Sequence, residues 1–126
     1  RNHLIIDAYN ANPTSMAAAL DNFSLMPDAE KMVILGEMRE LGEASDEEHL
    51  RILQRLQRVA CVQIWLVGEC FKKALKHSPL SADARVRVFE GVEDVKQALT
   101  ATPINHKLIL IKGSNGTRLF VLPELL

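Results

Sequence analysis

The sequence has 126 residues, of which 48% are hydrophobic and 25% charged, with 15 basic and 16 acidic side chains and a formal net charge of -1. This composition excludes a disordered chain, and the balanced charge argues against a general field that attracts nucleic acid or an anionic membrane. Its longest apolar runs, such as 108–111, fall far short of the ~20 residues that a membrane span requires. We therefore expect a folded protein with neither a nucleic-acid nor a membrane partner.

The start of the chain, Arg1-Asn2-His3, leads almost at once into an apolar segment without an initiator methionine, which indicates a piece of a larger protein. The length suits one hydrophobic core, and no repeat or long linker divides it. We expect a single domain over 1–126. Two cysteines, Cys61 and Cys70, have neither zinc nor redox spacing, which fits a reducing cytoplasm.

In the first part of the chain, a short β-like run is followed by helical periodicity. A strand is predicted over 3–8, and a helix follows with Asn12 as its N-cap and Pro13 as its first residue, because proline has no N–H to leave unbonded. The inner face of this helix is predicted to carry Met16, Ala19, Leu20 and Phe23. Pro27-Asp28 is expected to end it.

The middle of the chain predicts a second strand over 31–35 and a polar loop over 37–44. Ser45, with Glu48 three residues later, indicates a capping box that begins the next helix. The inner side of that helix is predicted to carry Ile52, Leu53, Leu56, Val59 and Ala60.

Further strands are predicted over 62–67, 86–89 and 107–111, with a short helix from 69 to about 76 and another marked by Val92, Val95 and Leu99. A terminal helix is expected after Gly113 and Gly116. Strands that alternate with helices are typical of a parallel sheet. The predicted fold class is α/β, a Rossmann-like three-layer domain with a mostly parallel sheet of about six strands and helices on both faces.

Ligands of open parallel sheets bind beyond the carboxyl ends of the strands, so the loops at 7–13, 36–43, 68–70 and 112–117 are the candidate site. In the first loop, Asp7 is suited to accept ribose hydroxyls, Tyr9 offers a flat surface, and Asn10 and Asn12 bring paired donors and acceptors. These groups suit a nucleotide. The alternative is that Asp7 caps a turn and the asparagines only serve helix geometry.

The last loop combines a point charge on Lys112, the close backbone approach allowed by Gly113, and hydroxyls on Ser114 and Thr117. A carboxylate or phosphate suits such a loop. The P-loop pattern GxxxxGK[ST] is absent from the sequence, and Lys-Gly-Ser also occurs in ordinary exposed turns, which stays the alternative.

The loop after the second strand carries Glu37, Met38, Arg39, Glu40 and Leu41. Such a charged run is usually a solvated face, although a loop bounded by glycines is also able to close over a small ligand. The sequence leaves both open.

The remaining polar candidates indicate structure rather than chemistry. For His49, contact with the preceding loop and plain surface exposure are both open, and surface exposure is expected. His3, His77 and His106 lack the spacing of a metal site, and we expect no metal ligands. Trp65 is expected in the core, and the two cysteines as buried or half-buried thiols.

Three blocks of the sequence resemble the C-terminal domain of the Mur ligase family: Leu4-Ile5-Ile6-Asp7-Ala8-Tyr9-Asn10-Ala11-Asn12-Pro13-Thr14-Ser15-Met16, Leu35-Gly36-Glu37-Met38-Arg39-Glu40-Leu41-Gly42-Glu43 with Ser45 and His49, and Ile111-Lys112-Gly113-Ser114. They occur in the order and with the separations of the family, so the resemblance covers essentially the whole chain. It is closest to the members that add D-alanyl-D-alanine to the UDP-N-acetylmuramoyl-tripeptide.

The resemblance implies a three-domain, ATP-dependent ligase of the bacterial cytoplasm that acts through an acyl phosphate in peptidoglycan precursor synthesis. The N-terminal domain would hold the UDP-sugar, and the central domain would hold the P-loop and Mg²⁺. This chain would be the third domain, with no catalytic residue and no activity when isolated. We expect the protein to be a monomer.

The resemblance also implies roles for single residues. For ATP binding it implies Asp7, Tyr9, Asn10 and Asn12. For binding the incoming dipeptide it implies Glu37, Met38, Glu40, Leu41, Lys112, Gly113 and Ser114.

Two other functional hypotheses remain open. One is another Mur-type ligase, such as an enzyme that adds a different amino acid or adds glutamate to folate, against which the run Tyr9-Asn10-Ala11-Asn12-Pro13 argues. The other is a stand-alone nucleotide-binding or regulatory α/β module. The sequence upstream of Arg1 would distinguish them, because a ligase requires a P-loop domain there.

Overall fold

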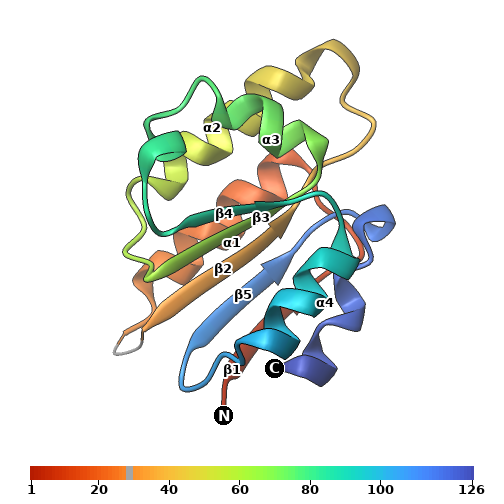
Figure 1. Cartoon of the computed structure of the whole chain (residues 1–126). Helices are drawn as coiled ribbons and strands as arrows, with labels where there is room; N and C mark the ends of the chain where they lie inside the picture. The colour runs from red at the N-terminus through yellow and green to blue at the C-terminus, as the bar shows by residue number, and fades with distance from the viewer. Residues whose placement is uncertain (28–29) are drawn as a thin grey trace.

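The computed structural model describes residues 1–27 and 30–126 (Figure 1). Its strands are β1 (His3–Asp7), β2 (Lys31–Gly36), β3 (Gln63–Val67), β4 (Val86–Phe89) and β5 (Leu108–Lys112). Its α-helices are α1 (Pro13–Leu25), α2 (Ser45–Leu56), α3 (Glu69–Leu75) and α4 (Val92–Ala101). The predicted helix stop at Pro27-Asp28 lies partly outside the described residues, and α1 itself ends at Leu25.

The strands form one parallel sheet in the order β1-β5-β2-β3-β4. The middle strand, β2, is buried along its whole length, as its continuous apolar sequence requires for a strand covered on both faces. The α/β class and the parallel sheet are confirmed, with five strands among the described residues rather than about six.

The end of the described chain differs from the prediction. Instead of a terminal helix it forms three short 3₁₀ turns, η3 (Asn115–Thr117), η4 (Leu119–Val121) and η5 (Pro123–Leu125). Arg118 takes a left-handed backbone with φ of 58°, which interrupts a right-handed helical path, and Pro123 has no N–H to continue one. The segment is therefore a chain of separate turns.

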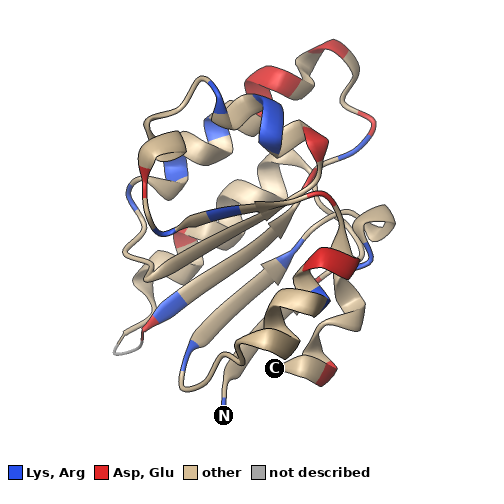
Figure 2. Ribbon diagram, in the orientation of Figure 1, with Lys and Arg blue, Asp and Glu red and all other residues tan. Residues whose placement is uncertain are grey.

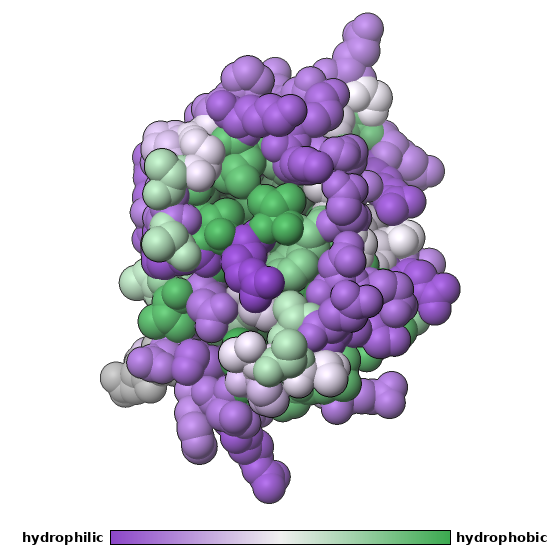
Figure 3. Space-filling view, in the orientation of Figure 1, coloured by the Kyte–Doolittle hydropathy of each residue, from purple (hydrophilic) through white to green (hydrophobic). Residues whose placement is uncertain are grey.

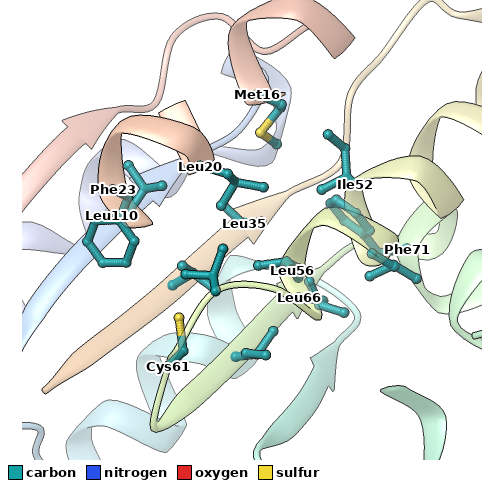
Figure 4. Close-up of a cluster of buried hydrophobic side chains, with 14 of the residues drawn as sticks. Met16, Leu20, Phe23, Leu35, Ile52, Leu56, Cys61, Leu66, Phe71 and Leu110 are labelled. Atoms are coloured by element: carbon teal, nitrogen blue, oxygen red, sulfur yellow. The ribbon is translucent and has the colours of Figure 1, made fainter. Parts of the chain in front are cut away.

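One face of the sheet packs against α1, α2 and α3 (Figure 4). Met16, Leu20 and Phe23 of α1 are all buried there, as the helical spacing predicted, and Ala19 packs against the same cluster. From α2 come Ile52, Leu53 and Leu56. Val59 is buried beyond the end of α2, whereas Ala60, predicted to face inward, is exposed because the helix has already ended.

The other face packs against α4 and the terminal turns. Trp65 is 2% exposed in this second core, as predicted, and the guanidinium of Arg87 lies 5.1 Å from its ring and 5.0 Å from that of Phe89. Figure 3 shows apolar side chains that surface in the middle of the viewed face, within a hydrophilic surround. A sheet covered on both faces completes the three layers.

Of the two helix N-caps predicted from the sequence, the one at Asn12 is correct and the one at Ser45 is wrong. Asn12 caps α1, and its side chain accepts from the N–H of Ser15 while the Ser15 hydroxyl bonds back, so the capping box lies here. The box predicted at Ser45 is wrong. The 3₁₀ turn η1 (Gly42–Ala44) leads directly into α2, so Ser45 already has helical backbone angles and its side chain makes no cap bond.

Among the helices of the described residues, none is long and apolar enough to cross a membrane.

Candidate ligand-binding edge of the sheet

The carboxyl ends of all five strands lie along one edge of the parallel sheet, which we call the carboxyl edge. Asp7 at the end of β1 and Leu35 near the end of β2 both lie level with Lys112 of β5. The three sequence blocks are thereby brought to one edge, as predicted. Figure 2 shows acidic and basic residues interspersed along it.

Lys112 connects β5 to the loop after β1, residues 8–12, which we call the β1–α1 loop. Its side chain is 2% exposed, and its ammonium donates to Oδ2 of Asp7 over 2.6 Å and to the carbonyl of Asn10 over 3.1 Å. Asp7 remains 53% exposed on the other side. The buried cation therefore fixes the loop and leaves the carboxylate accessible to a ligand.

The β1–α1 loop presents the other predicted nucleotide contacts to solvent. Tyr9 is 68% exposed, and its ring stacks on Phe120 with the centroids 5.5 Å apart and the planes 5° from parallel. Asn10 is exposed, whereas the amide oxygen of Asn12 already accepts the Ser15 N–H as a helix cap. Asn12 thus serves helix geometry, as the alternative interpretation of this residue expected.

The loop after β2, residues 37–41, is called the β2–α2 loop, and its residues divide by burial. Met38 is 1% exposed and Leu41 packs against the first core, so these two support the loop from below. Glu37 accepts the N–H of Cys70 at the start of α3 over 2.9 Å and lies 3.5 Å from the guanidinium of Arg39. Glu40 is exposed, with φ of 63°.

His49 holds the β2–α2 loop from α2. Sequence reasoning favoured a surface position, but the imidazole is fully buried, and its Nε2 accepts the Met38 N–H over 2.9 Å. The loop contact that was the less favoured interpretation is correct. Burial lowers the pKa of His49, while its bond to the Ser45 carbonyl and the charge of Glu37 act in the opposite direction.

The segment that follows β5, residues 113–117, is called the β5 turn, and it lies between the two loops. A Cβ on Gly113 would stand 2.8 Å from Oγ1 of Thr117 and 2.9 Å from Cα of Gly36, so the turn packs directly on the end of β2. The N–H of Gly113 donates to the carbonyl of Asp7, and that of Ser114 to the carbonyl of Glu37. These two amides join the loops. The Ser114 hydroxyl is buried without a partner among the described residues.

A pocket of about 260 Å³ opens on the carboxyl edge beside the β2–α2 loop. Its charged lining includes Arg39 and Arg118 together with Glu37, Glu69 and Glu90. Sequence reasoning did not assign a role to either arginine. Arg39 was named within its loop, and the only signal for Arg118 was a cation directly after a turn rich in glycine.

Larger hollows lie away from this edge. One of about 490 Å³ is at the opposite end of the sheet and includes His3 and His106, and one of about 500 Å³ lies between α1 and α2. Neither brings together residues of the three sequence blocks, so volume does not mark the candidate site here.

The thiols and histidines form no metal centre among the described residues, where no group of three or more His, Cys, Asp or Glu is placed to hold an ion. Cys61 is buried, which raises the pKa of its thiol to about 11, and Cys70 is half-buried with a raised pKa from the same cause. Both match the expected plain thiols.

Comparison with known proteins gives consistent matches. The UDP-N-acetylmuramoyl-tripeptide–D-alanyl-D-alanine ligase of Rickettsia prowazekii is 35% identical over 92% of this chain and 25% of its own. A crystal structure of MurF from Acinetobacter baumannii matches 98% of the chain and 27% of its own, with a TM-score of 0.78 and 29% identity. MurF of Thermotoga maritima in complex with ADP shares the fold, with a TM-score of 0.73 and 20% identity.

The chain thus spans about a quarter of the length of these relatives. The model of the family described as "Mur ligase, glutamate ligase domain" matches residues 1–115. The chain belongs to the Mur ligase family and has the fold of its C-terminal domain.

Proposed function

We propose that this chain is the C-terminal domain of an ATP-dependent ligase that joins D-alanyl-D-alanine to the UDP-N-acetylmuramoyl-tripeptide. The observation that carries the proposal is the meeting of the three sequence blocks on the carboxyl edge, where an accessible carboxylate on Asp7 and a pocket lined by two arginines lie on either side of the β5 turn. One side suits a nucleotide, and the other suits a small zwitterion.

The chemistry explains why two ligands must meet. A carboxylate is a poor electrophile, so the γ-phosphoryl group of ATP is first transferred to the terminal carboxylate of the tripeptide, which yields ADP and an acyl phosphate. The amine of the dipeptide then attacks the acyl carbon, and inorganic phosphate leaves as the amide bond forms. The proposed contribution of this domain is to orient the amine and to exclude water that would hydrolyse the acyl phosphate.

On the nucleotide side, we assign the ribose hydroxyls to Asp7, whose carboxylate is held by Lys112 yet remains half exposed. Tyr9 and Asn10 lie in the same loop with exposed side chains and would line the cleft that faces the rest of the enzyme. Asn12 would contribute through the shape of the loop that it caps.

On the dipeptide side, the pocket of about 260 Å³ lies below the ~300–1,000 Å³ of sites for drug-sized ligands, which suits a ligand the size of a dipeptide. Arg39 and Arg118 would pair with its carboxylate, and Glu37 or Glu90 with its ammonium group before deprotonation. Glu40 lies at the exposed end of the same loop. Met38, Leu41, Lys112, Gly113 and Ser114 would act by shaping this side of the edge.

The remaining parts of the reaction are assigned to the central and N-terminal domains of the parent protein in the bacterial cytoplasm. Those domains would bind the UDP-sugar, the phosphates of ATP and Mg²⁺. We assign none of the described residues to the metal, because no cluster among them is suited to hold one.

The test is phosphate release by the full-length protein that carries this chain, with D-alanyl-D-alanine present or withheld. We expect release to depend on ATP, on the tripeptide substrate and on the dipeptide. Arg118→Ala should raise the KM for the dipeptide about tenfold, the effect of one lost charged hydrogen bond, while the exposed Arg58→Ala serves as the matched control.

Asp7 is best tested with Asp7→Asn, because Asn keeps an oxygen for the buried Lys112 ammonium while it weakens the ribose contact. An unchanged KM for ATP in Asp7→Asn would remove the nucleotide assignment. Phosphate release that does not depend on the dipeptide would sink the ligase proposal, and the absence of any ATP-dependent release by the full-length protein would favour a module without chemistry.

A further inference from the structure

His49 makes two backbone hydrogen bonds from a fully buried position at the start of α2. Nε2 accepts the Met38 N–H over 2.9 Å, and Nδ1 lies 2.7 Å from the carbonyl oxygen of Ser45. The ring also meets the ring of Phe71 edge-on, with centroids 4.7 Å apart and planes at 86°. The side chain thus links the β2–α2 loop to α2 and α3.

The two backbone partners determine the tautomer. A backbone N–H is only a donor and a carbonyl oxygen only an acceptor, so Nε2 must carry a lone pair and Nδ1 must carry the proton. Only the neutral imidazole with its proton on Nδ1 satisfies both bonds. A second proton, on Nε2, would face the Met38 N–H and break the link to the loop.

The position of Met38 in the loop makes this link important for the pocket. The neighbours of Met38, Glu37 and Arg39, both line the pocket on the carboxyl edge. Beyond them the loop turns back through left-handed backbone at Glu40, with φ of 63°, and Gly42, with φ of 58°. The Met38 amide lies between Glu37 and Arg39, just before this turn, and is therefore the point at which the loop is anchored.

We propose that His49 is a positioning residue that holds Glu37 and Arg39 in the arrangement that binds the dipeptide, and that it releases them when it is protonated. This inference rests on the proposed ligase function. His49 itself touches no substrate, so its effect reaches the reaction only through the Met38 amide and the loop.

The charged and titratable groups around the ring act in both directions. Burial is the largest influence and lowers the pKa of His49, whereas the Ser45 carbonyl and the nearby carboxylates raise it. The carboxylates belong to Glu37 of the loop and to Asp46 and Glu48 of α2. On α3, the apolar ring of Phe71 packs against the imidazole, the thiol of Cys70 interacts with Ser45 and Glu37, and Lys73 pairs with Asp46. The net effect keeps the ring neutral at neutral pH.

The experiment compares His49→Leu and His49→Gln in the full-length protein. Leu removes the acceptor and leaves the buried Met38 N–H without a partner, whereas Gln offers an amide oxygen near the position of Nε2 and does not titrate. We expect His49→Leu to raise the KM for D-alanyl-D-alanine about tenfold or more with the KM for ATP within about twofold, and His49→Gln to recover most of the loss. The exposed His77→Leu is the control for removal of a histidine.

A pH profile separates positioning from simple support of the fold. In the wild type, the KM for the dipeptide should rise as the pH falls through the lowered pKa of His49, and in His49→Gln this rise should be absent. If His49→Leu folds poorly, the Gln profile alone decides. Equal effects of His49→Leu on both KM values, or the same acid rise in His49→Gln, would overturn the inference.

Failure of the ligase proposal has a different signature. It is seen in the wild type, as phosphate release that does not depend on the dipeptide. The link itself is then measured without activity, by hydrogen exchange of the Met38 amide. Exchange at this amide should be slower in the wild type than in His49→Leu, and equal rates would show that His49 does not hold the loop.

Discussion

Each of the two loops beside the β5 turn is held by its own buried polar side chain, and the two side chains use opposite hydrogen-bonding chemistry. Lys112 holds the β1–α1 loop with a charged donor, and its main partner is the carboxylate of Asp7. His49 holds the β2–α2 loop with a neutral acceptor, and its partner is a backbone amide. The first anchor uses a residue assigned to ATP, whereas the second leaves the assigned ligand contacts free.

This difference has a consequence for mutation. Removal of the whole Asp7 carboxylate, as in Asp7→Ala, should disturb the proposed ATP contact and the anchor together, because the carboxylate is assigned to both. A change at Arg39 or Arg118 should alter the pocket proposed for the dipeptide while the His49 anchor stays intact. Binding and stability should therefore be coupled on the nucleotide side and separable on the dipeptide side.

The largest effect is expected for Asp7→Ala. The substitution leaves the ammonium of Lys112, which is 2% exposed, with only the Asn10 carbonyl. We expect a loss of about 3 kcal/mol in the free energy of unfolding in urea, at the low end for a broken buried pair because Asp7 is half exposed. Lys112→Met removes the buried charge itself and should cost only about 1 kcal/mol. Equal losses would show that the ammonium is hydrated rather than buried.

The next effect concerns the β5 turn that joins the loops. Gly113→Ala places a methyl group 2.8 Å from Oγ1 of Thr117 and 2.9 Å from Cα of Gly36, where backbone cannot give way easily. We expect a loss of about 2 kcal/mol in the free energy of unfolding, with reduced affinity for both ligands.

The control for stability alone is Gly91→Ala, also on the carboxyl edge, where an added Cβ meets no atom within 4 Å. Gly91 itself lines the pocket, so ligand affinities are not compared between the two variants. The cost of Gly91→Ala should stay under about 1 kcal/mol. If both substitutions lower the free energy of unfolding equally, the close packing of the turn on β2 is not what requires glycine at position 113.

Smaller effects are expected at the N-termini of the two helices to which the loops lead. Asn12→Ala removes the cap of α1, to which the β1–α1 loop leads, and should cost about 1 kcal/mol in unfolding free energy. Ser45→Ala, at the position of the predicted but absent capping box, should cost under about 0.5 kcal/mol. The reverse order, measured by urea unfolding of each variant, would restore the box that the sequence pattern indicated.

The fold was predictable because its signals are local. The buried strands are continuous apolar runs, and the inner face of α1 follows the spacing of Met16, Leu20 and Phe23. The capping box at Ser45 failed because a capping residue needs non-helical backbone angles, and η1 upstream removes them, which the pattern of Ser45 and Glu48 does not reveal.

The site was predictable at the level of loops but not of side-chain partners. Parallel topology brings the strand ends together, so the edge followed from the element order. The pairing of Lys112 with Asp7 spans 105 residues, and burial of His49 depends on how α2 and α3 meet the loop. Such contacts are set by tertiary packing, which explains why sequence reasoning did not find the Lys112–Asp7 pair and placed His49 on the surface.

The last prediction separates the two anchors by pH. Because burial lowers the pKa of His49 below 6.5, the unfolded chain takes up this proton at a higher pH than the folded one. The stability that His49 contributes is therefore fully present above about pH 6.5, and it is lost as the pH falls from there through the folded pKa.

His49→Gln lacks this proton, so the difference in urea midpoint between the wild type and His49→Gln should shrink as the pH is lowered from about 8 to about 5. The other titrating groups cancel in that difference, since both proteins carry them. Lys112→Met keeps His49 and should follow the wild-type pH dependence. Parallel curves for the wild type and His49→Gln would mean that the imidazole takes its second proton without losing the Met38 amide, and the contrast between a charged and a neutral anchor would then fail.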